Sequence, residues 1–257
     1  MTASLYSPQF FAEQAPGSLD SARAVVPIIM EAVTCRSVID IGCGVGTWLS
    51  VFLENGVTDI QGIDGPYVDV ETLLIPRDRF VKADLAEALP RLERTFDVAL
   101  CLEVAEHLPA SSSKKLVQAL TSYSPIVVFS ASVPFQEGTG HINEQWLEYW
   151  IQCFSQSGYV PIDYLRPKIW HNPAVEWWYA QNTIFYVDER ALAKYPQLQA
   201  AQNIGWGGTP FSLIHPKFLL HKERRLTGVP LKEVWNNAIS RTWNAVSRRI
   251  KKLVQPR

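Results

Sequence analysis

The chain has 257 residues, of which 47% are apolar and 19% are charged, and its formal net charge at pH 7 is −1. This length accommodates one core-forming domain with an extension, and the apolar fraction is that of an ordinary globular protein. The charge is uneven, because residues 221–257 hold ten Lys or Arg and two Glu. The rest of the chain is therefore acidic, which argues against a broad nucleic-acid-binding surface, and we expect no nucleic-acid partner.

The cysteines and the chain start indicate a reducing compartment. The four cysteines have no C-x-x-C spacing and lie in or beside apolar runs, which is typical of buried thiols and not of a disulfide framework or a zinc site. The first twenty residues have neither a basic region nor an apolar region of the kind found in signal peptides. No apolar run approaches the ~20 residues that span a bilayer. We expect a cytoplasmic protein.

Strand-like and helix-like segments alternate along the chain, which predicts a mainly parallel sheet with helices on both faces. A first helix is predicted over 20–34, capped by Ser18 or Asp20 and kinked or split by Pro27. Strands are predicted at 37–41, 58–63, 79–82, 96–102, 126–130, 159–165 and 181–187. The main intervening helices are predicted at 47–55, about 111–122 and 144–156, the last capped by Asn143. We expect the last two strands to form an antiparallel hairpin at the edge of the sheet.

The first predicted strand runs into a glycine-rich turn. Gly42, Gly44 and Gly46 stand at alternate positions, and a helix is predicted from Thr47. Glycine has no Cβ, so the backbone can turn tightly and approach a ligand closely. The N–H groups at the start of the helix point at the same place. The pattern indicates a nucleotide-like cofactor.

The spacing narrows the identity of that cofactor. The dinucleotide fingerprint has a third glycine where this chain has Thr47. Asp40, two residues before the first glycine, would repel a pyrophosphate but attract a cation. S-adenosylmethionine carries a sulfonium and an ammonium group and no phosphate. The turn therefore favours S-adenosylmethionine over NAD, and an NAD-dependent oxidoreductase is the alternative.

An acidic residue stands at the carboxyl end of each of the next two predicted strands. Asp64 ends the second strand, twenty residues after Gly44, where Rossmann-like folds place the carboxylate that binds ribose hydroxyls. Asp84 ends the third strand, and the segment Glu103–Pro109 follows the fourth. With these features the chain resembles the class I S-adenosylmethionine-dependent methyltransferases over residues 20–187, and most closely a bacterial subgroup with an E-x-x-E-H segment. The resemblance implies a Rossmann-like, doubly wound, mainly parallel seven-stranded sheet with an antiparallel last strand, here with a C-terminal extension.

The resemblance also implies a set of cofactor-binding residues: Asp40, Gly42, Cys43, Gly44, Gly46, Asp64, Asp84, Leu85, Leu102 and Glu103. By the resemblance, Asp40 and the glycine turn cradle the methionine end of S-adenosylmethionine, and Asp64 holds its ribose. Asp84 and Leu85 meet the adenine edge, while the last two residues line the pocket near the reacting centre. As alternatives, Asp40 caps the end of a strand and Asp84 caps a helix.

Methyl transfer to a hydroxyl group needs a general base. His141 is the first candidate, because it lies in a glycine-flanked loop after the fifth strand, at the edge of the sheet where ligands bind. His107 is the second, beside Glu103 and Glu106, whose carboxylates would raise its pKa and orient its ring. The same four residues offer ligands for a metal ion. We expect no metal, because their spacing requires a helical segment that Pro109 ends.

An aromatic segment at 166–180 separates the last two predicted strands. Four of its side chains are candidates for substrate binding: Trp170, His171, Trp177 and Trp178. Loops on a rigid scaffold carry specificity, and aromatic rings suit sugars and planar acceptors. The alternative is that these rings bury the edge of the sheet.

The expected organisation is a methyltransferase domain at 1–199, an irregular connecting segment at 200–230, and a basic amphipathic helix at 231–257. That helix either docks on its own domain or on a second copy in a homodimer, or it binds the inner face of the membrane peripherally. The sequence predicts an S-adenosylmethionine-dependent enzyme that methylates oxygen on a small molecule or glycan. N- or carboxyl-methylation, and a non-catalytic subunit that binds S-adenosylmethionine, are the alternatives.

Overall fold

The computed structural model describes residues 8–87, 89–204 and 211–226. The chain divides into two units, Met1–His215 and Pro216–Arg257. The first unit holds the sheet and its helices, and the second contributes one described helix, α8 (Pro216–Leu226). The basic helix predicted at 231–257 lies outside the described residues.

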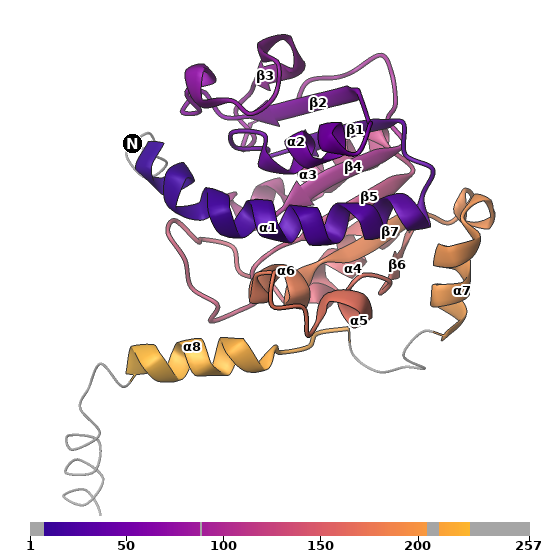
Figure 1. The fold of residues 1–257 in the computed structure, drawn as a ribbon. Coiled ribbons are helices and arrows are strands. Elements are labelled where there is room, and N and C mark those ends of the chain that lie inside the picture. Colours follow the sequence, from indigo (N-terminus) through magenta and orange to yellow (C-terminus); the bar gives the residue numbers. More distant parts are fainter. Residues whose placement is uncertain (1–7, 88, 205–210, 227–257) are drawn as a thin grey trace, which may run out of the picture. The chain divides into compact units, whose positions relative to one another are not determined.

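One seven-stranded sheet organises the first unit, in the order β3-β2-β1-β4-β5-β7-β6 (Figure 1). The strands are β1 (Ser37–Ile41), β2 (Asp59–Asp64), β3 (Phe80–Lys82), β4 (Val98–Leu102), β5 (Ile126–Ser130), β6 (Tyr159–Ile162) and β7 (Ile184–Asp188). β1 pairs in parallel with β2 and β4, whereas β7 runs antiparallel to β5 and β6. The predicted fold class is confirmed. The strand order reverses between β1 and β4, and open α/β sheets bind their ligands over the carboxyl ends of the strands at such a point.

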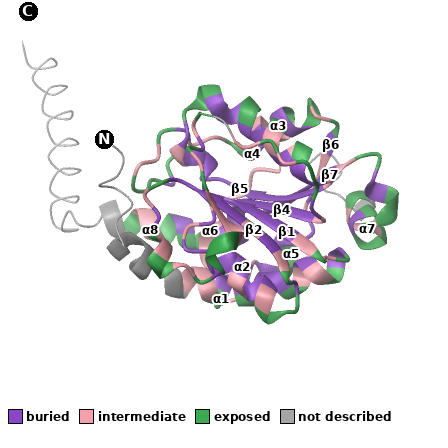
Figure 2. Ribbon diagram, turned by 90° about the horizontal axis from the view of Figure 1, so that it is seen from above, coloured by how far each residue is buried: buried purple, intermediate pink, exposed green. Residues whose placement is uncertain are grey.

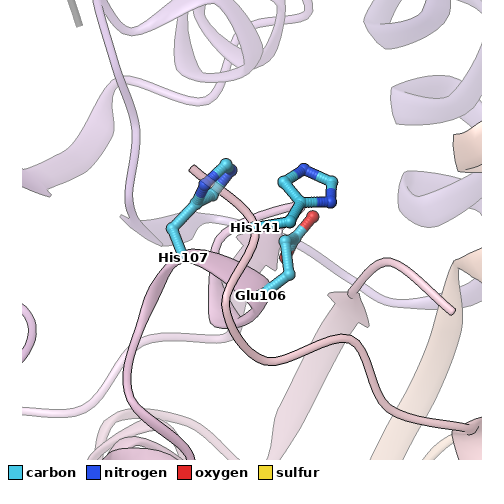
Figure 3. A group of neighbouring side chains, drawn as sticks. All are labelled: Glu106, His107 and His141. Carbon is cyan, nitrogen blue, oxygen red and sulfur yellow. The ribbon is translucent and has the colours of Figure 1, made fainter. Parts of the chain in front are cut away.

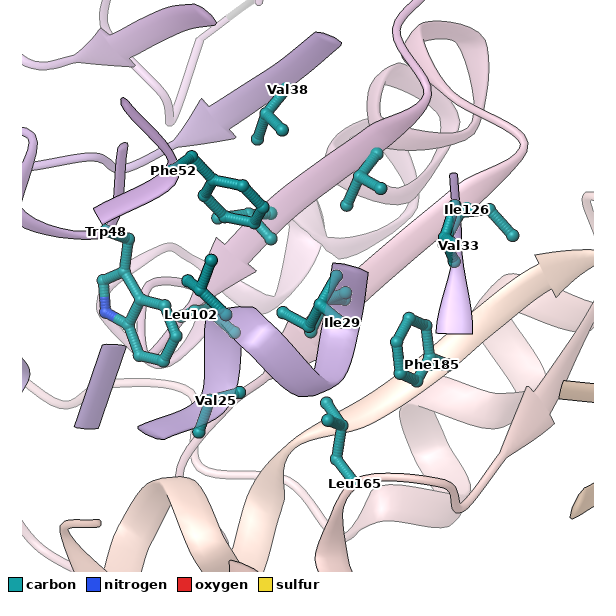
Figure 4. Packing of buried hydrophobic residues seen from close by; sticks show 14 of the residues in the cluster. Val25, Ile29, Val33, Val38, Trp48, Phe52, Leu102, Ile126, Leu165 and Phe185 are labelled. Carbon is teal, nitrogen blue, oxygen red and sulfur yellow. The ribbon is translucent and has the colours of Figure 1, made fainter. Parts of the chain in front are cut away.

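Helices cover both faces of the sheet, as Figure 2 shows with its buried strands between them. The helices of the first unit are α1 (Pro8–Ala32), α2 (Thr47–Glu54), α3 (Ser113–Tyr123), α4 (Leu147–Ser155), α5 (Arg166–Ile169), α6 (Trp177–Asn182) and α7 (Pro196–Ile204). Successive strand residues point to opposite faces. Val38 therefore joins the apolar cluster with α1 and α2, while Ile39 joins the cluster with α3 and α4. Figure 4 shows the first of these clusters, in which Ile29 of α1 and Phe52 of α2 pack on the sheet.

Short 3-10 turns complete the loops at Val70–Thr72, Arg77–Arg79, Ala105–His107, Ala110–Ser112 and Leu192–Lys194. Where irregular chain is expected at 200–230, residues 216–226 form α8. None of the helices within the described residues is long and apolar enough to cross a membrane.

α1 is longer than predicted and is not split at Pro27. Proline in a helix interior costs roughly 3 kcal/mol, because one hydrogen bond is lost and the ring crowds the preceding turn. Pro27 lies on the exposed side of α1, so the carbonyl of exposed Arg23 can turn to solvent. Val26 and Ile29, both 0% exposed, gain about 1.5–3 kcal/mol each from burial on the sheet, which outweighs that cost.

Other boundaries differ as well: β4 begins at Val98 and not at 96, and β6 ends at Ile162 and not at 165. α4 begins at Leu147, because Asn143 does not cap it: its Oδ1, the atom that would cap a helix, accepts from the Gln145 amide at 3.0 Å. β7 begins at Ile184 and not at 181, because the preceding residues complete α6.

Candidate active site

The turn between β1 and α2 is built on glycines in the left-handed conformation. The φ angle is +80° at Gly42, +55° at Gly44 and +85° at Gly46, which is also the N-cap of α2. A Cβ atom on Gly42 would lie 2.3 Å from Cγ2 of Val104, so no larger residue fits there without a shift. Cys43 is 7% exposed and its side chain belongs to the apolar core, so it can offer only its backbone to a ligand.

Asp40 and Asp64 lie beside this turn, and their carboxyl groups differ in their hydrogen bonds and in their pKa shifts. Asp40 is 3% exposed, and its side chain has no hydrogen-bond partner among the described residues. Burial and the neighbouring Asp64 raise the pKa of Asp40 to about 7. Burial also raises the pKa of Asp64, although three hydrogen bonds oppose that effect. Asp40 is therefore the carboxyl group that lacks a compensating partner.

Asp64 already accepts three hydrogen bonds. Its Oδ2 accepts from the N–H of Gly44 at 2.6 Å, and its Oδ1 accepts from the N–H of Gly65 and from the Tyr67 hydroxyl, each at 2.6 Å. A carboxylate accepts about four. One acceptor position thus remains for a hydroxyl group of a ligand, and the Tyr67 hydroxyl is a competitor that the sequence did not reveal.

The predicted adenine-binding residues lie after β3. Asp84 is exposed, and its Oδ1 accepts from the N–H of Ala86 at 3.0 Å, which is the local cap considered as the alternative. Leu85 is 7% exposed and packs in the second apolar cluster. The cap leaves the second oxygen of Asp84 available, so an adenine contact there stays a prediction.

Glu103 follows β4 directly and is held in a rare backbone conformation. Its φ angle is +55°, a region that costs a non-glycine residue roughly 1–3 kcal/mol and marks functional sites. Its N–H donates to the carbonyl of Ser130 at 3.0 Å, which ties it to the end of β5. Leu102, one residue earlier, is 8% exposed and packs in the first apolar cluster. The side chain of Glu103 therefore turns over the carboxyl edge of the sheet.

A polar network gathers around that side chain. Gln136 donates to Oε2 of Glu103 at 3.2 Å, and Asn182, at the end of α6, donates to Oε1 at 3.1 Å. Ser132 donates to Glu103 at 3.3 Å and to Glu106 at 3.0 Å. Gln181 donates to Gln136 at 3.4 Å. Residues from the loop after β5 and from α6 thereby fix one carboxylate.

Figure 3 shows the second group at this edge, Glu106, His107 and His141. One ligand atom of each lies within 4.8 Å of the others. Glu106 is 0% exposed, and burial together with the neighbouring Glu103 raises its pKa well above the usual range. Burial, reinforced by His141, lowers the pKa of His107 to about 4, so the expectation that the neighbouring carboxylates raise this pKa is wrong. The two candidate bases are therefore neighbours, and His107 is neutral at pH 7.

Glu144 organises the loop that carries His141. Its Oε2 accepts from the N–H of Phe135 at 2.8 Å, and its Oε1 accepts from the N–H of Glu137 at 2.6 Å. Both of these donors have a positive φ, +69° and +61°. Oε1 is also 3.0 Å from Nδ1 of His141. A carboxylate can only accept, so Nδ1 carries the proton, and in the neutral ring the lone pair is on Nε2.

The aromatic segment lies partly against the core. The Trp170 ring is 4.7 Å from the ring of His215, and the rings of Trp177 and Trp178 are 5.5 Å apart at 84°. These tryptophans are half-buried, whereas His171 is exposed. The segment is joined to the cofactor turn, because Tyr179 contacts Trp48 of α2 with ring centroids 5.1 Å apart. Which of these side chains contact a substrate stays a prediction.

Six site residues were missed by sequence reasoning: Tyr67, Ser132, Gln136, Glu144, Gln181 and Asn182. Five of them follow no motif, since single polar residues in loops and helix ends are common. Glu144 carried a weak signal, because it lies three residues after His141 and His–carboxylate pairs orient imidazole rings.

A family model described as a methyltransferase domain matches residues 9–198. Magnesium protoporphyrin IX methyltransferase from Synechocystis PCC 6803, solved with bound SAH, is 16% identical; the match covers 70% of this chain and 88% of that one, with a TM-score of 0.51. The sugar N-methyltransferase KedS8 from Streptoalloteichus sp ATCC 53650 is 15% identical; the match covers 70% of this chain and 91% of that one, also with a TM-score of 0.51. At these identities the likeness concerns the fold. No curated protein matches the chain.

Proposed function

The chain belongs to the family of methyltransferase domains, and we propose that it transfers the methyl group of S-adenosylmethionine to an oxygen atom of a small molecule or glycan. When bound, this donor supplies a methyl group made electrophilic by the sulfonium. The chain's own residues must hold the donor, align the acceptor oxygen with the methyl carbon, remove its proton and exclude water.

The cofactor side of the site fits a cationic donor. Asp40 is a buried carboxyl group without a hydrogen-bond partner in the described part of the chain. A buried charge of this kind is costly unless an opposite charge or hydrogen-bond donors approach it. The ammonium group of S-adenosylmethionine would supply both, and its sulfonium would supply positive charge. Asp64 keeps one acceptor position for a ribose hydroxyl group.

The proposal of an oxygen acceptor depends on one observation, the contact between His141 and Glu144. The 3.0 Å contact at Nδ1 leaves Nε2 of His141 free at the carboxyl edge of the sheet. With the donor bound, Nε2 would accept the proton that the acceptor hydroxyl loses when it takes the methyl group, and S-adenosylhomocysteine would be the leaving group. Glu144 then stabilises the positively charged imidazole ring. Neutral amines and carboxylates need less help from a base, so such a pair is less useful to them.

The experiment is a calorimetric titration with S-adenosylhomocysteine, followed by an assay for its release from S-adenosylmethionine with a panel of phenols, sugars, amines and carboxylic acids. We expect binding, and turnover with a hydroxyl acceptor. In His141→Gln, turnover should fall while S-adenosylhomocysteine binding is kept. Binding without turnover on any acceptor or cell extract would favour a non-catalytic subunit. Binding of NADH but not of S-adenosylhomocysteine would overturn the proposal.

The aromatic side chains after β6 are proposed to contact the acceptor. Trp177 and Trp178 present half-buried rings at right angles, next to the residues that reach Glu103. Aromatic faces of this kind bind sugar rings and planar acceptors. Replacing Trp177 by Ala should raise the KM for the acceptor more than that for S-adenosylmethionine. An equal rise in both would assign the ring to the cofactor side.

The remaining partner predictions concern residues beyond the described ranges. Peripheral binding to an anionic membrane, or a homodimer, is proposed for the basic segment at 231–257. Flotation with anionic liposomes, comparing the full chain with a truncation after Gly228, tests whether this segment binds a membrane. Loss of flotation on truncation supports membrane binding, and equal recovery removes it. The absence of a nucleic-acid partner and a cytoplasmic location also stay predictions.

A further inference from the structure

Three side chains converge at the carboxyl edge of the sheet. Glu106, His107 and His141 each bring one nitrogen or oxygen atom within 4.8 Å of the others (Figure 3). The centroids of the two imidazole rings are 4.8 Å apart at 82°. One carboxyl group and two imidazole rings in such close proximity form a set of side chains that can bind a metal ion.

Glu106 supplies an independent observation that points to a ligand. Its Oε2 is buried and has no hydrogen-bond partner among the described residues, while Oε1 accepts from the Ser132 hydroxyl at 3.0 Å. A buried polar atom without a partner costs about 1–3 kcal/mol. Native structures rarely contain such atoms unless a water molecule, an ion or a functional role accounts for them. The atom without a partner, Oε2, belongs to Glu106, whose carboxyl group also lies beside the imidazole rings of His107 and His141.

The second nitrogen of each imidazole is already fixed by an acceptor. Nδ1 of His141 donates to Glu144 at 3.0 Å. His107 donates from its ring to the backbone carbonyl of Gly140. Histidine ligands of metal ions almost always donate the other ring N–H to a carboxylate or a carbonyl, which sets the tautomer and the ring orientation. Both histidines therefore have the outer hydrogen bond that metal ligands need.

The backbone holds this group together without the helix that sequence spacing required. Residues Ala105–His107 form one 3-10 turn, and within it one ligand atom each of Glu106 and His107 lie within 4.8 Å of each other. The N–H groups of Ile142 and Asn143 donate to the carbonyl of Glu106 at 2.8 and 3.0 Å. These bonds clamp the loop of His141 onto the turn after β4. The reason for expecting no metal, that Pro109 ends the segment too early, does not apply to this geometry.

We infer that Glu106, His107 and His141 bind one divalent first-row transition ion, such as Mn²⁺, Fe²⁺, Co²⁺ or Zn²⁺. Two imidazole nitrogens and one carboxylate oxygen are a donor set that these ions prefer to the all-oxygen sets of Ca²⁺ and Mg²⁺. Three protein ligands leave at least one position open, as in catalytic sites. The carboxylate of Glu103 lies next to the site, because the Ser132 hydroxyl is 3.3 Å from Glu103 and 3.0 Å from Glu106.

The catalytic meaning of this site rests on the proposed function, although metal binding itself does not. An acceptor oxygen in the open position would have its hydroxyl pKa lowered by the ion. Nε2 of His141 would then be a metal ligand, and the proton would leave to solvent. In the metal-free protein the same nitrogen is the base. Acceptors with two neighbouring oxygens, such as vicinal diols, would be favoured because they can chelate the ion.

The test is a titration of the full-length, chelator-treated protein with Co²⁺, followed by its visible absorption bands, with Zn²⁺ competition measured by calorimetry. We expect one equivalent to bind. Glu106→Gln and His141→Gln should each weaken binding by about 100-fold or more, and Glu144→Gln by about 10- to 100-fold, as for outer-sphere partners of metal ligands. His171→Ala removes an exposed histidine outside the group and should leave the affinity unchanged.

Circular dichroism and S-adenosylhomocysteine binding, measured on the same samples, separate the possible failures. Glutamine has the shape of a protonated glutamic acid, so Glu106→Gln should stay folded. If the wild-type protein binds S-adenosylhomocysteine but does not bind Co²⁺ in excess, the metal inference is wrong and the methyltransferase proposal survives. Stoichiometric Co²⁺ binding that persists in folded Glu106→Gln and His141→Gln would also overturn it. Metal binding without S-adenosylhomocysteine binding would contradict the proposed function alone.

Discussion

The two halves of the carboxyl edge of the sheet are built in different ways. On the β1–β2 side, the site consists of a glycine turn and two acids at strand ends, all within 25 residues of one another between Asp40 and Asp64. On the β4–β5 side, the partners are far apart in sequence: Asn182 reaches Glu103 across 79 residues and Ser132 reaches Glu106 across 26. The first half is local chain geometry, and the second is a network assembled by the fold.

This difference indicates separate roles for the β1–β2 side, which we call the cofactor half, and the β4–β5 side, which we call the acceptor half. The cofactor half leaves one buried carboxyl group, Asp40, for a cation of the donor. The acceptor half fixes its polar side chains by hydrogen bonds to one another, and leaves Oε2 of Glu106 and Nε2 of His141 available for a ligand. Damage to the first half should change donor binding and stability, whereas damage to the second should change the rate.

The sharpest test of that division is His141→Gln. If the acceptor half carries proton removal, kcat should fall by about 10²- to 10⁴-fold, the usual contribution of a general base. The affinity for S-adenosylhomocysteine, from calorimetry, should stay within experimental error. A loss of affinity as large as the loss of rate would show that the two halves do not work separately.

Asp40→Asn tests the cofactor half. The folded pKa of about 7 lies above the ordinary 3.8, so the folded state binds more protons and loses stability as pH rises from about 4 to 7. This difference amounts to at most about 4 kcal/mol. Asp40→Asn should abolish that decline in the metal- and donor-free protein, measured by urea unfolding at a series of pH values, while S-adenosylmethionine binds less tightly. An unchanged pH profile would place the titrating group elsewhere.

Gly42→Ala asks whether the local geometry of the cofactor turn is required. The left-handed φ costs alanine about 1–2 kcal/mol, and the clash with Val104 adds about 1–3 kcal/mol. Gly56→Ala is the matched control, because Gly56 has a φ of +88° and a Cβ atom added there would meet nothing within 4 Å. Urea unfolding should show a larger loss in Gly42→Ala, with loss of S-adenosylhomocysteine binding there alone. Equal losses would mean that the backbone conformation, and not the close approach, explains the glycine.

Asn182→Ala should have the smallest of these effects. It leaves Oε1 of Glu103 without its donor, which should cost about 1–3 kcal/mol of unfolding free energy and lower kcat. Gln118→Ala, on the exposed surface of α3, should change stability by less than about 0.5 kcal/mol. If both variants behave alike, the long-range network does not support the site.

Sequence patterns predicted the sheet well because each strand is a short apolar run followed by a turn. β1 and β5 begin and end at the predicted residues. The predictions were less accurate where tertiary contacts decide, as at Pro27, whose cost is outweighed by burial of α1, and at Asn143, whose side chain serves a loop and not a helix. In the site, the residues next to motifs were found, and the polar residues on α6 and on the loop after β5 were not.

The sequence alone determined the alternation of strands and helices, the glycine turn and the acids that follow the strands, because each depends on neighbours a few residues away. Only the tertiary structure decided which carboxyl group is left without a partner and which histidine nitrogen is free. It also decided that Glu106, His107 and His141 meet at one point. Hydrogen-bond partners and burial depend on which loops the sheet brings side by side, and no local pattern records that.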